Sequence, residues 1–133
     1  SVTCCEFQSP EIWWPDMEAE MYEAATGYPL TKEDLDEAAV RSKLLFRAIL
    51  MRNHGRTRAM EVDAVWPGIS IPDQYGEVAD WDGFNDLVDR YYETRGWDKE
   101  TSWPYRSTWE RYGLADIADE MEKLGKLPAE PVS

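Results

Sequence analysis

The sequence has little of several residue types on which common protein activities depend. Only two of its 133 residues are cysteine and only one is histidine. It contains no run of about 18 apolar residues, so no membrane-spanning helix is predicted, and its start lacks the residue order of a secretory signal. Cys4 and Cys5 are adjacent, and neighbouring cysteines bridge poorly. We therefore expect free thiols and a cytoplasmic, reducing compartment.

Basic residues are also scarce. The chain has 14 Lys and Arg against 27 Asp and Glu, which gives a net charge of −13. Nucleic acids and anionic membranes bind through clustered cations, so neither is expected as a partner. Aromatic residues, in contrast, are abundant, with seven Trp, seven Tyr and three Phe. Their apolar area offsets chain entropy, so the chain is expected to fold rather than to be an acidic disordered tail.

No complete active site is recognisable, and no catalytic residue is assigned. The single histidine, His54, lies in "RNHG", where it is best explained as a helix-end residue that interacts with the helix dipole. A pairing of His54 with Cys4 or Cys5 would need the fold to bring distant segments together. The segment "WPGISIP" lacks the spacing of a phosphate-binding loop. The acidic clusters "EDLDE" and "DWDGFND" do not match a calcium loop.

The periodicity predicts helices and no strand. A helix is expected from about 16 to Gly27, with its apolar face at Met17, Met21, Ala24 and Ala25. A second helix of about 20 residues should begin with a capping box at Thr31 and Asp34 and end before Gly55. Its apolar residues are Leu35, Ala38, Ala39, Leu45, Ala48 and Ile49.

Three further helices follow. The first, ending at Gly96, carries a stripe at i, i+3, i+4, i+7 and i+8 that predicts a core-facing side. The stripe consists of Phe84, Leu87, Val88, Tyr91 and Tyr92, and its first four residues and Leu45 are expected to be largely buried. The next helix should be capped by Ser107 and Glu110, and the last should place Leu114, Ile117, Met121 and Leu124 on one face.

Residues 56–80 interrupt this pattern with two prolines and two glycines. Their apolar stretches are too short to predict helices, so we expect an irregular loop. Either it simply crosses the surface, or Trp66, Ile69, Ile71 and Tyr75 lay it across apolar surface, which we favour. The fold class is thus all-α, a compact bundle of about five helices with one long irregular loop. Residues 1–15 form an N-terminal segment with the cysteine motif, 16–126 a helical domain, and 127–133 a flexible tail.

A chain that begins at a cysteine pair predicts a piece of a larger protein, and several motifs indicate which one. The start "SVTCCEF" resembles the Asp-x-x-Gly-Leu-Cys motif of the tungsten-containing aldehyde:ferredoxin oxidoreductase family. The segments "ATGYPLTKEDLDEAAVR", "FRAILMRNHGRTR", "LVDRYYETRGWD" and "TWERYGLADIADEMEKLGKLP" follow in family order. Thr3 stands where the family has Gly, Cys4 where it usually has Leu, and "WPGISIPDQYG" differs from the usual acidic loop, which indicates a divergent branch.

The resemblance implies a C-terminal domain of an enzyme that oxidises aldehydes to carboxylic acids with ferredoxin as electron acceptor. Cys5 matches the fourth ligand of a [4Fe–4S] cluster beside a tungsten or molybdenum bis-pterin, and the backbone of Thr3 and Cys4 would lie on the pterin side. The other ligands and the catalytic residues would belong to the N-terminal remainder of the enzyme. The isolated chain is therefore expected to hold no cofactor and to be inactive. The alternative is a free-standing acidic helical module that binds another protein.

Overall fold

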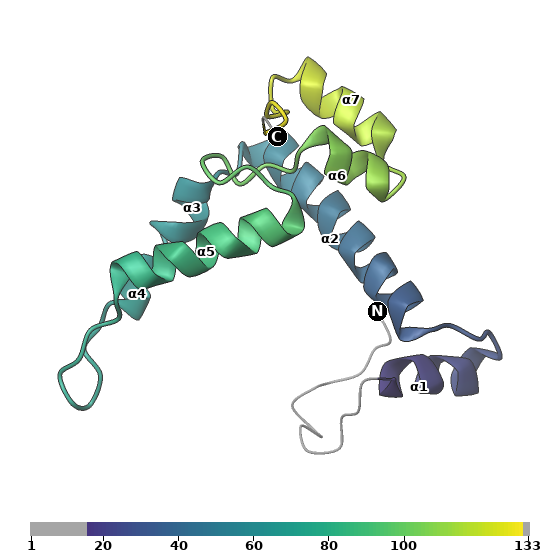
Figure 1. The fold of residues 1–133 in the computed structure, drawn as a ribbon, viewed down its shortest axis with the longest axis horizontal. Coiled ribbons are helices and arrows are strands. Elements are labelled where there is room, and N and C mark those ends of the chain that lie inside the picture. Colours follow the sequence, from purple (N-terminus) through teal and green to yellow (C-terminus); the bar gives the residue numbers. More distant parts are fainter. Residues whose placement is uncertain (1–15, 132–133) are drawn as a thin grey trace. The chain divides into compact units, whose positions relative to one another are not determined.

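A computed structural model of the chain describes residues 16–131 (Figure 1). The helices are α1 (Met17–Thr26), α2 (Lys32–His54), α3 (Arg58–Val62), α4 (Trp66–Ile69), α5 (Trp81–Arg95), α6 (Arg106–Arg111) and α7 (Ala115–Lys123). The described residues contain no strand, only an isolated bridge between Trp97 and Pro104. The all-α prediction is therefore confirmed. None of the described helices is long and apolar enough to cross a membrane.

The residues divide into two compact units, and the boundary falls inside α2, between Leu45 and Phe46. The first unit contains α1 and the first half of α2. The second contains the end of α2 and all later helices. Nothing in the sequence pattern predicts a boundary here, because the helix runs through it without Gly or Pro.

The longer helices begin and end where local chemistry predicts. Thr31 and Asp34 form the expected reciprocal cap: the Asp34 N–H donates to Thr31 Oγ1 at 3.1 Å, and the Thr31 N–H donates to Asp34 Oδ2 at 2.9 Å. The carboxylate of Asp80 accepts two backbone N–H groups in the first turn of α5. Gly27 and Gly96 end α1 and α5 with φ of 76° and 67°, a left-handed conformation that costs glycine little.

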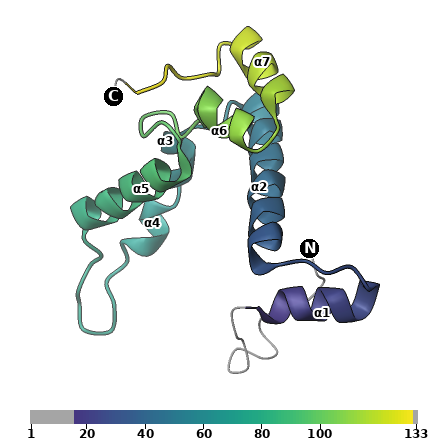
Figure 2. The same ribbon diagram turned by 45° about the vertical axis from the view of Figure 1, so that its right-hand side comes forward.

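The expectation of an entirely irregular segment over 56–80 is wrong. This segment contains α3 and α4, which run beside α5 in both views (Figures 1 and 2). Helices of five and four residues are too short to show a helical period, so the pattern does not reveal them. Trp66 packs against Trp81, as expected for a segment laid across apolar surface. Ile71 and Tyr75, in contrast, are 67% and 80% exposed within the described part of the chain.

The core of the second unit forms around the inner face of α2 and the C-terminal helices. Its fully or nearly buried apolar side chains are Ala48, Met51, Val62, Tyr92, Trp97, Trp109, Leu114, Ala118 and Met121. On α5, the spacing correctly groups the stripe on one side of the helix, but the burial predicted for it is wrong. Leu87 is 60% exposed, Tyr91 and Leu45 are also exposed, and Phe84 and Val88 are only partly covered. Periodicity identifies a shared face but not what covers it.

The predicted capping box at Ser107 and Glu110 is also wrong, because α6 begins without a side-chain cap. The N–H of Ser107 donates instead to Glu130 Oε1 at 2.8 Å, and its hydroxyl donates to Oε2 at 3.0 Å. Lys126 donates to the carbonyl oxygens of Met51 and Arg52 at the end of α2. Residues after α7 thus contact both α6 and α2.

Candidate functional site

The residues that the sequence assigns to cofactors, Thr3, Cys4 and Cys5, lie outside the described part of the chain. Within residues 16–131, no three His, Cys, Asp or Glu side chains are grouped as a metal site. The described residues form a different candidate site, which is a groove in the second unit. Its geometry decides what the domain can bind.

The groove has a volume of about 290 Å³ and lies between α3 and α5. Its lining residues are Glu61, Val62, Phe84, Leu87, Val88, Tyr91 and Tyr92. Five of the seven come from the predicted stripe of α5, so the spacing that predicts a core face forms the wall of a groove instead. Among the described residues, the side chains of Leu87 and Tyr91 are 60% and 37% exposed, so this wall of the groove presents apolar surface. A groove of this composition suits an apolar ligand group.

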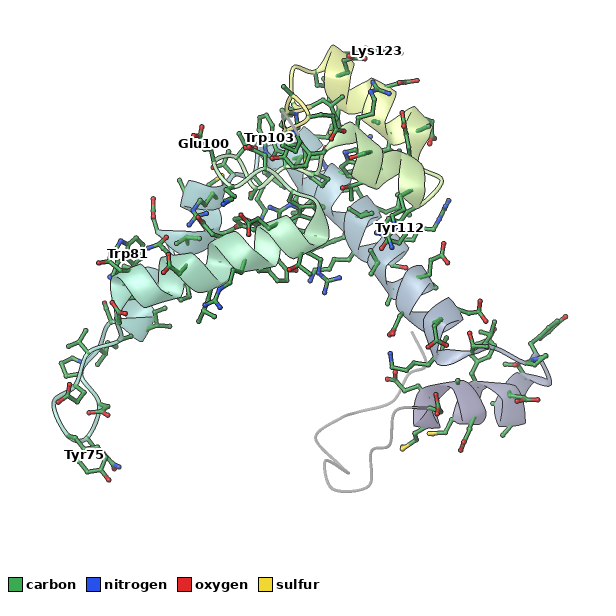
Figure 3. The ribbon with its side chains drawn as sticks, in the orientation of Figure 1. Tyr75, Trp81, Glu100, Trp103, Tyr112 and Lys123 are labelled. Atoms are coloured by element: carbon green, nitrogen blue, oxygen red, sulfur yellow. The ribbon has the colours of Figure 1, made fainter. Side chains whose placement is uncertain are left out.

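An aromatic cluster stands beside the groove at the N-terminal end of α5. The rings of Trp66 and Trp81 meet edge to face with centroids 4.4 Å apart. Phe84 lies 5.7 Å from Trp66 and 6.1 Å from Trp81. Figure 3 shows Trp81 at this end of the helix. Contacts of this kind add to the stabilisation from burial alone, so the cluster fixes Phe84 as a rigid part of the groove wall.

The polar end of the groove is a carboxylate whose two oxygens are both occupied. Glu61 Oε1 receives hydrogen bonds from Arg47 and, at 2.7 Å, from Nε of Arg56. Glu61 Oε2 receives the hydroxyl of Tyr92 at 2.8 Å. The Glu61 side chain is only 14% exposed, and a buried carboxylate is stable only when it is paired in this way.

These contacts determine the protonation states of both groups. Burial alone would raise the pKa of Glu61, but the hydrogen bond and charge of Arg47, with help from Tyr92 and Arg56, hold the pKa below its ordinary value. Burial and the bond to Glu61 raise the pKa of Tyr92 to about 12. Near neutral pH the carboxylate is ionised and the phenol is protonated.

Arg47 is held from three sides. Its guanidinium lies 4.3 Å from the centroid of the Trp97 ring, and its Nη2 donates to the carbonyl oxygen of Ser102 at 2.7 Å and to the Ser102 hydroxyl. Ser102 is fully buried with φ of 65°, which is the left-handed region that a serine rarely adopts. Arg47 thus stabilises a strained turn and at the same time neutralises Glu61.

Arg58 fixes α3 against α5 beside the groove. Its Nη1 lies 2.5 Å from Asp89 Oδ1, and its Nη2 donates to Asn85 Oδ1 at 2.9 Å. The guanidinium also lies 5.6 Å from the centroid of the Tyr92 ring. These contacts explain how a helix of only five residues holds its position, because so short a helix is not stable alone.

Arg47 and Glu61 are functional candidates that the sequence reading misses. The signal for Arg47 is its place one helical turn from both Leu44 and Met51, on a face that is otherwise apolar. The signal for Glu61 is an acid between the apolar residues Met60 and Val62. His54 is the last residue of α2 and is exposed, as its interpretation as a helix-end residue predicts.

Comparison with known families gives a match that covers most of the chain. Residues 1–114 match the family described as aldehyde ferredoxin oxidoreductase, domains 2 & 3. The match includes the cysteine segment, the groove and the Arg47–Glu61–Tyr92 contacts. Helix α7 and the residues after it lie beyond the matched range.

Proposed function

Because the chain belongs to the aldehyde ferredoxin oxidoreductase family, we propose that it is the C-terminal domain of a pterin-dependent iron–sulfur oxidoreductase. In this proposal the parent enzyme oxidises aldehydes to carboxylic acids and passes the electrons to ferredoxin or another electron-transfer protein. The family match over residues 1–114 carries the proposal and favours it over a free-standing protein-binding module. The tungsten or molybdenum pterin, when bound, supplies the redox chemistry.

Cys5 is proposed as one ligand of a [4Fe–4S] cluster. Such clusters are held by four thiolates, and the chain has only two cysteines. The remaining ligands must therefore come from the N-terminal remainder of the enzyme. Cys4 takes no part in ligation, and its backbone and that of Thr3 lie on the pterin side.

The groove between α3 and α5 is proposed as part of the substrate channel. Its apolar wall would bind the hydrocarbon part of an aldehyde and exclude water from it. Glu61 already forms ion pairs with Arg47 and Arg56. The groove wall therefore presents no unpaired charge to an apolar substrate. The role of these residues is to bind and orient, while the reacting groups belong to the rest of the enzyme.

Anaerobic reconstitution with iron and sulfide tests the division of ligands. We expect four irons per polypeptide in the full-length enzyme and no stoichiometric incorporation in the 133-residue chain, measured by iron and sulfide analysis. Four irons per monomer in the isolated chain would show that it carries a complete ligand set and would overturn the proposal. Absence of a cluster from the full-length enzyme would overturn it as well.

A further inference from the structure

The last residue of α4 and the segment that joins α4 to α5 expose a set of large apolar side chains. Ile69, Ile71, Tyr75 and Val78 are 39%, 67%, 80% and 52% exposed. We call residues 69–80 the 69–80 loop. In Figures 1 and 2 this loop extends beyond the ends of α4 and α5, and Figure 3 shows Tyr75 at its tip. Four large apolar side chains exposed within one short segment make it a candidate for a protein–protein contact.

The 69–80 loop is ordered by its own hydrogen bonds. Oδ1 of Asp73 accepts the N–H of Tyr75 at 2.8 Å and the N–H of Glu77 at 3.0 Å. The backbone N–H of Asp73 donates to the carbonyl of Glu77 at 2.8 Å, and Gly76 turns the chain with φ of 85°. A loop that is already ordered loses less entropy on binding. Tyrosine is also a frequent energetic centre of interfaces.

The charge around the loop limits the kind of partner. Residues 59–89 contain eight Asp and Glu and no Lys or Arg. A surface that covers the loop must therefore be apolar at its centre and carry cations around it. A second copy of this chain fits poorly, because the chain has a net charge of −13 and would place like charges opposite the acidic surface around the loop.

We infer that the 69–80 loop is a docking element for the N-terminal remainder of the same enzyme, and that Tyr75 inserts into an apolar pocket bordered by Lys or Arg. This inference rests on the proposed function. The loop lies inside the matched range, and the matched family description covers domains 2 & 3, so an enzyme of this family has a further domain that the description leaves out. In this inference that further domain covers the apolar side chains of the 69–80 loop and supplies the basic residues that face the acidic surface around it.

Site-specific photo-crosslinking in the full-length enzyme tests this inference. Tyr75 is replaced by p-benzoylphenylalanine, the enzyme is purified with its cluster and irradiated, and the linked peptides are identified by mass spectrometry. We expect a link within one polypeptide, to a peptide that precedes Ser1 and contains Lys or Arg. The same replacement at Ile71 should reach the same region. Leu124, which is 47% exposed and follows α7 in the same unit, serves as the comparison site and should not reach that peptide.

A link from position 75 to a second copy or to a separate protein would overturn the inference, and so would the absence of any link. Capture of the same peptide from position 124 would also overturn it, because the contact would then not be specific to the loop. Iron analysis of the same preparation keeps the two proposals apart. Loss of the cluster in the unsubstituted enzyme would count against the proposed function, whereas a loaded cluster without the expected link counts only against the docking inference.

Discussion

Tyr92 donates its hydroxyl hydrogen to Oε2 of Glu61 at 2.8 Å, and this bond joins α5 to α3 at the polar end of the groove. The other oxygen of Glu61 receives Arg47 and Arg56, so the two oxygens of this mostly buried carboxylate share three donors. The groove therefore keeps its shape only while these partners remain. Stability measurements on single variants can test this dependence.

Tyr92→Phe should lower the free energy of unfolding by about 1–3 kcal/mol, because it leaves one oxygen of a mostly buried carboxylate without its donor. Urea denaturation at pH 7 measures the loss. Tyr75→Phe is the matched control, since the Tyr75 side chain is 80% exposed, and it should change stability by less than about 0.5 kcal/mol. Equal effects of the two substitutions would show that the Tyr92–Glu61 bond adds nothing.

Glu61→Gln should show a pH-dependent loss of stability. The pKa of Glu61 is lowered in the folded state from the ordinary 4.5, so its contribution is fully present above pH 4.5 and is lost as the pH falls through the folded pKa. The difference in unfolding free energy between the native chain and Glu61→Gln should therefore be largest near pH 7 and shrink in acid. Urea denaturation at pH 7 and at several acidic pH values measures it. A constant difference across this range would contradict the assignment.

Ser102 offers a direct test of backbone strain. Ser102→Ala and Ser102→Gly both remove the hydroxyl that contacts Arg47, but only glycine relieves the left-handed conformation at φ 65°. We therefore expect Ser102→Gly to be more stable than Ser102→Ala by about 1 kcal/mol. Thermal and urea midpoints of the two variants give this difference. An alanine variant as stable as the glycine variant would mean that the turn stores no strain.

Leu87→Ala should cost less than about 1 kcal/mol in the isolated chain, because Leu87 is 60% exposed. Met51→Ala on α2 should cost about 2–5 kcal/mol, since Met51 is fully buried and its loss leaves a cavity. Both are measured by urea denaturation. A large loss at Leu87 would show that α5 is covered in solution by something absent from this structure.

In the full-length enzyme, Leu87→Ser should lower kcat/KM for an apolar aldehyde by about 3- to 10-fold, because it removes apolar contact with the substrate in the proposed channel. The iron content should not change. Leu124→Ser is the matched control, since Leu124 is also exposed, at 47%, but lies outside the matched range. Equal losses in both variants, or no loss at Leu87, would argue against a channel along α5.

The sequence predicts the helices that carry their own start and stop signals. These signals act through neighbours a few residues away, so the helix ends that they set can be predicted without knowing the fold. They are Thr31 and Asp34 at the start of α2 and Gly27 and Gly96 at the ends of α1 and α5. The cap at Ser107 fails for the opposite reason. Its partner is Glu130, which is 23 residues away, and no local pattern reports such a contact.

The candidate site is less predictable because it depends on contacts between separate helices. The spacing of Leu87 and Tyr91 correctly places them on one face of α5, but whether that face meets a core or a groove depends on α3. Arg47 and Ser102 are 55 residues apart in sequence. The role of the cysteine segment is predicted only through its resemblance to a family, since the proposed cluster would need further ligands from outside this chain.

The most direct test of the central claim compares Cys5→Ala with Cys4→Leu in the full-length enzyme, by electron paramagnetic resonance of the reduced cluster and by iron analysis. Successive residues project in different directions along the backbone, so only one of the two thiols should reach the iron. We predict that Cys5→Ala removes or severely alters the cluster signal and that Cys4→Leu leaves it largely intact. An intact cluster in Cys5→Ala, with the cluster lost in Cys4→Leu, would contradict the account.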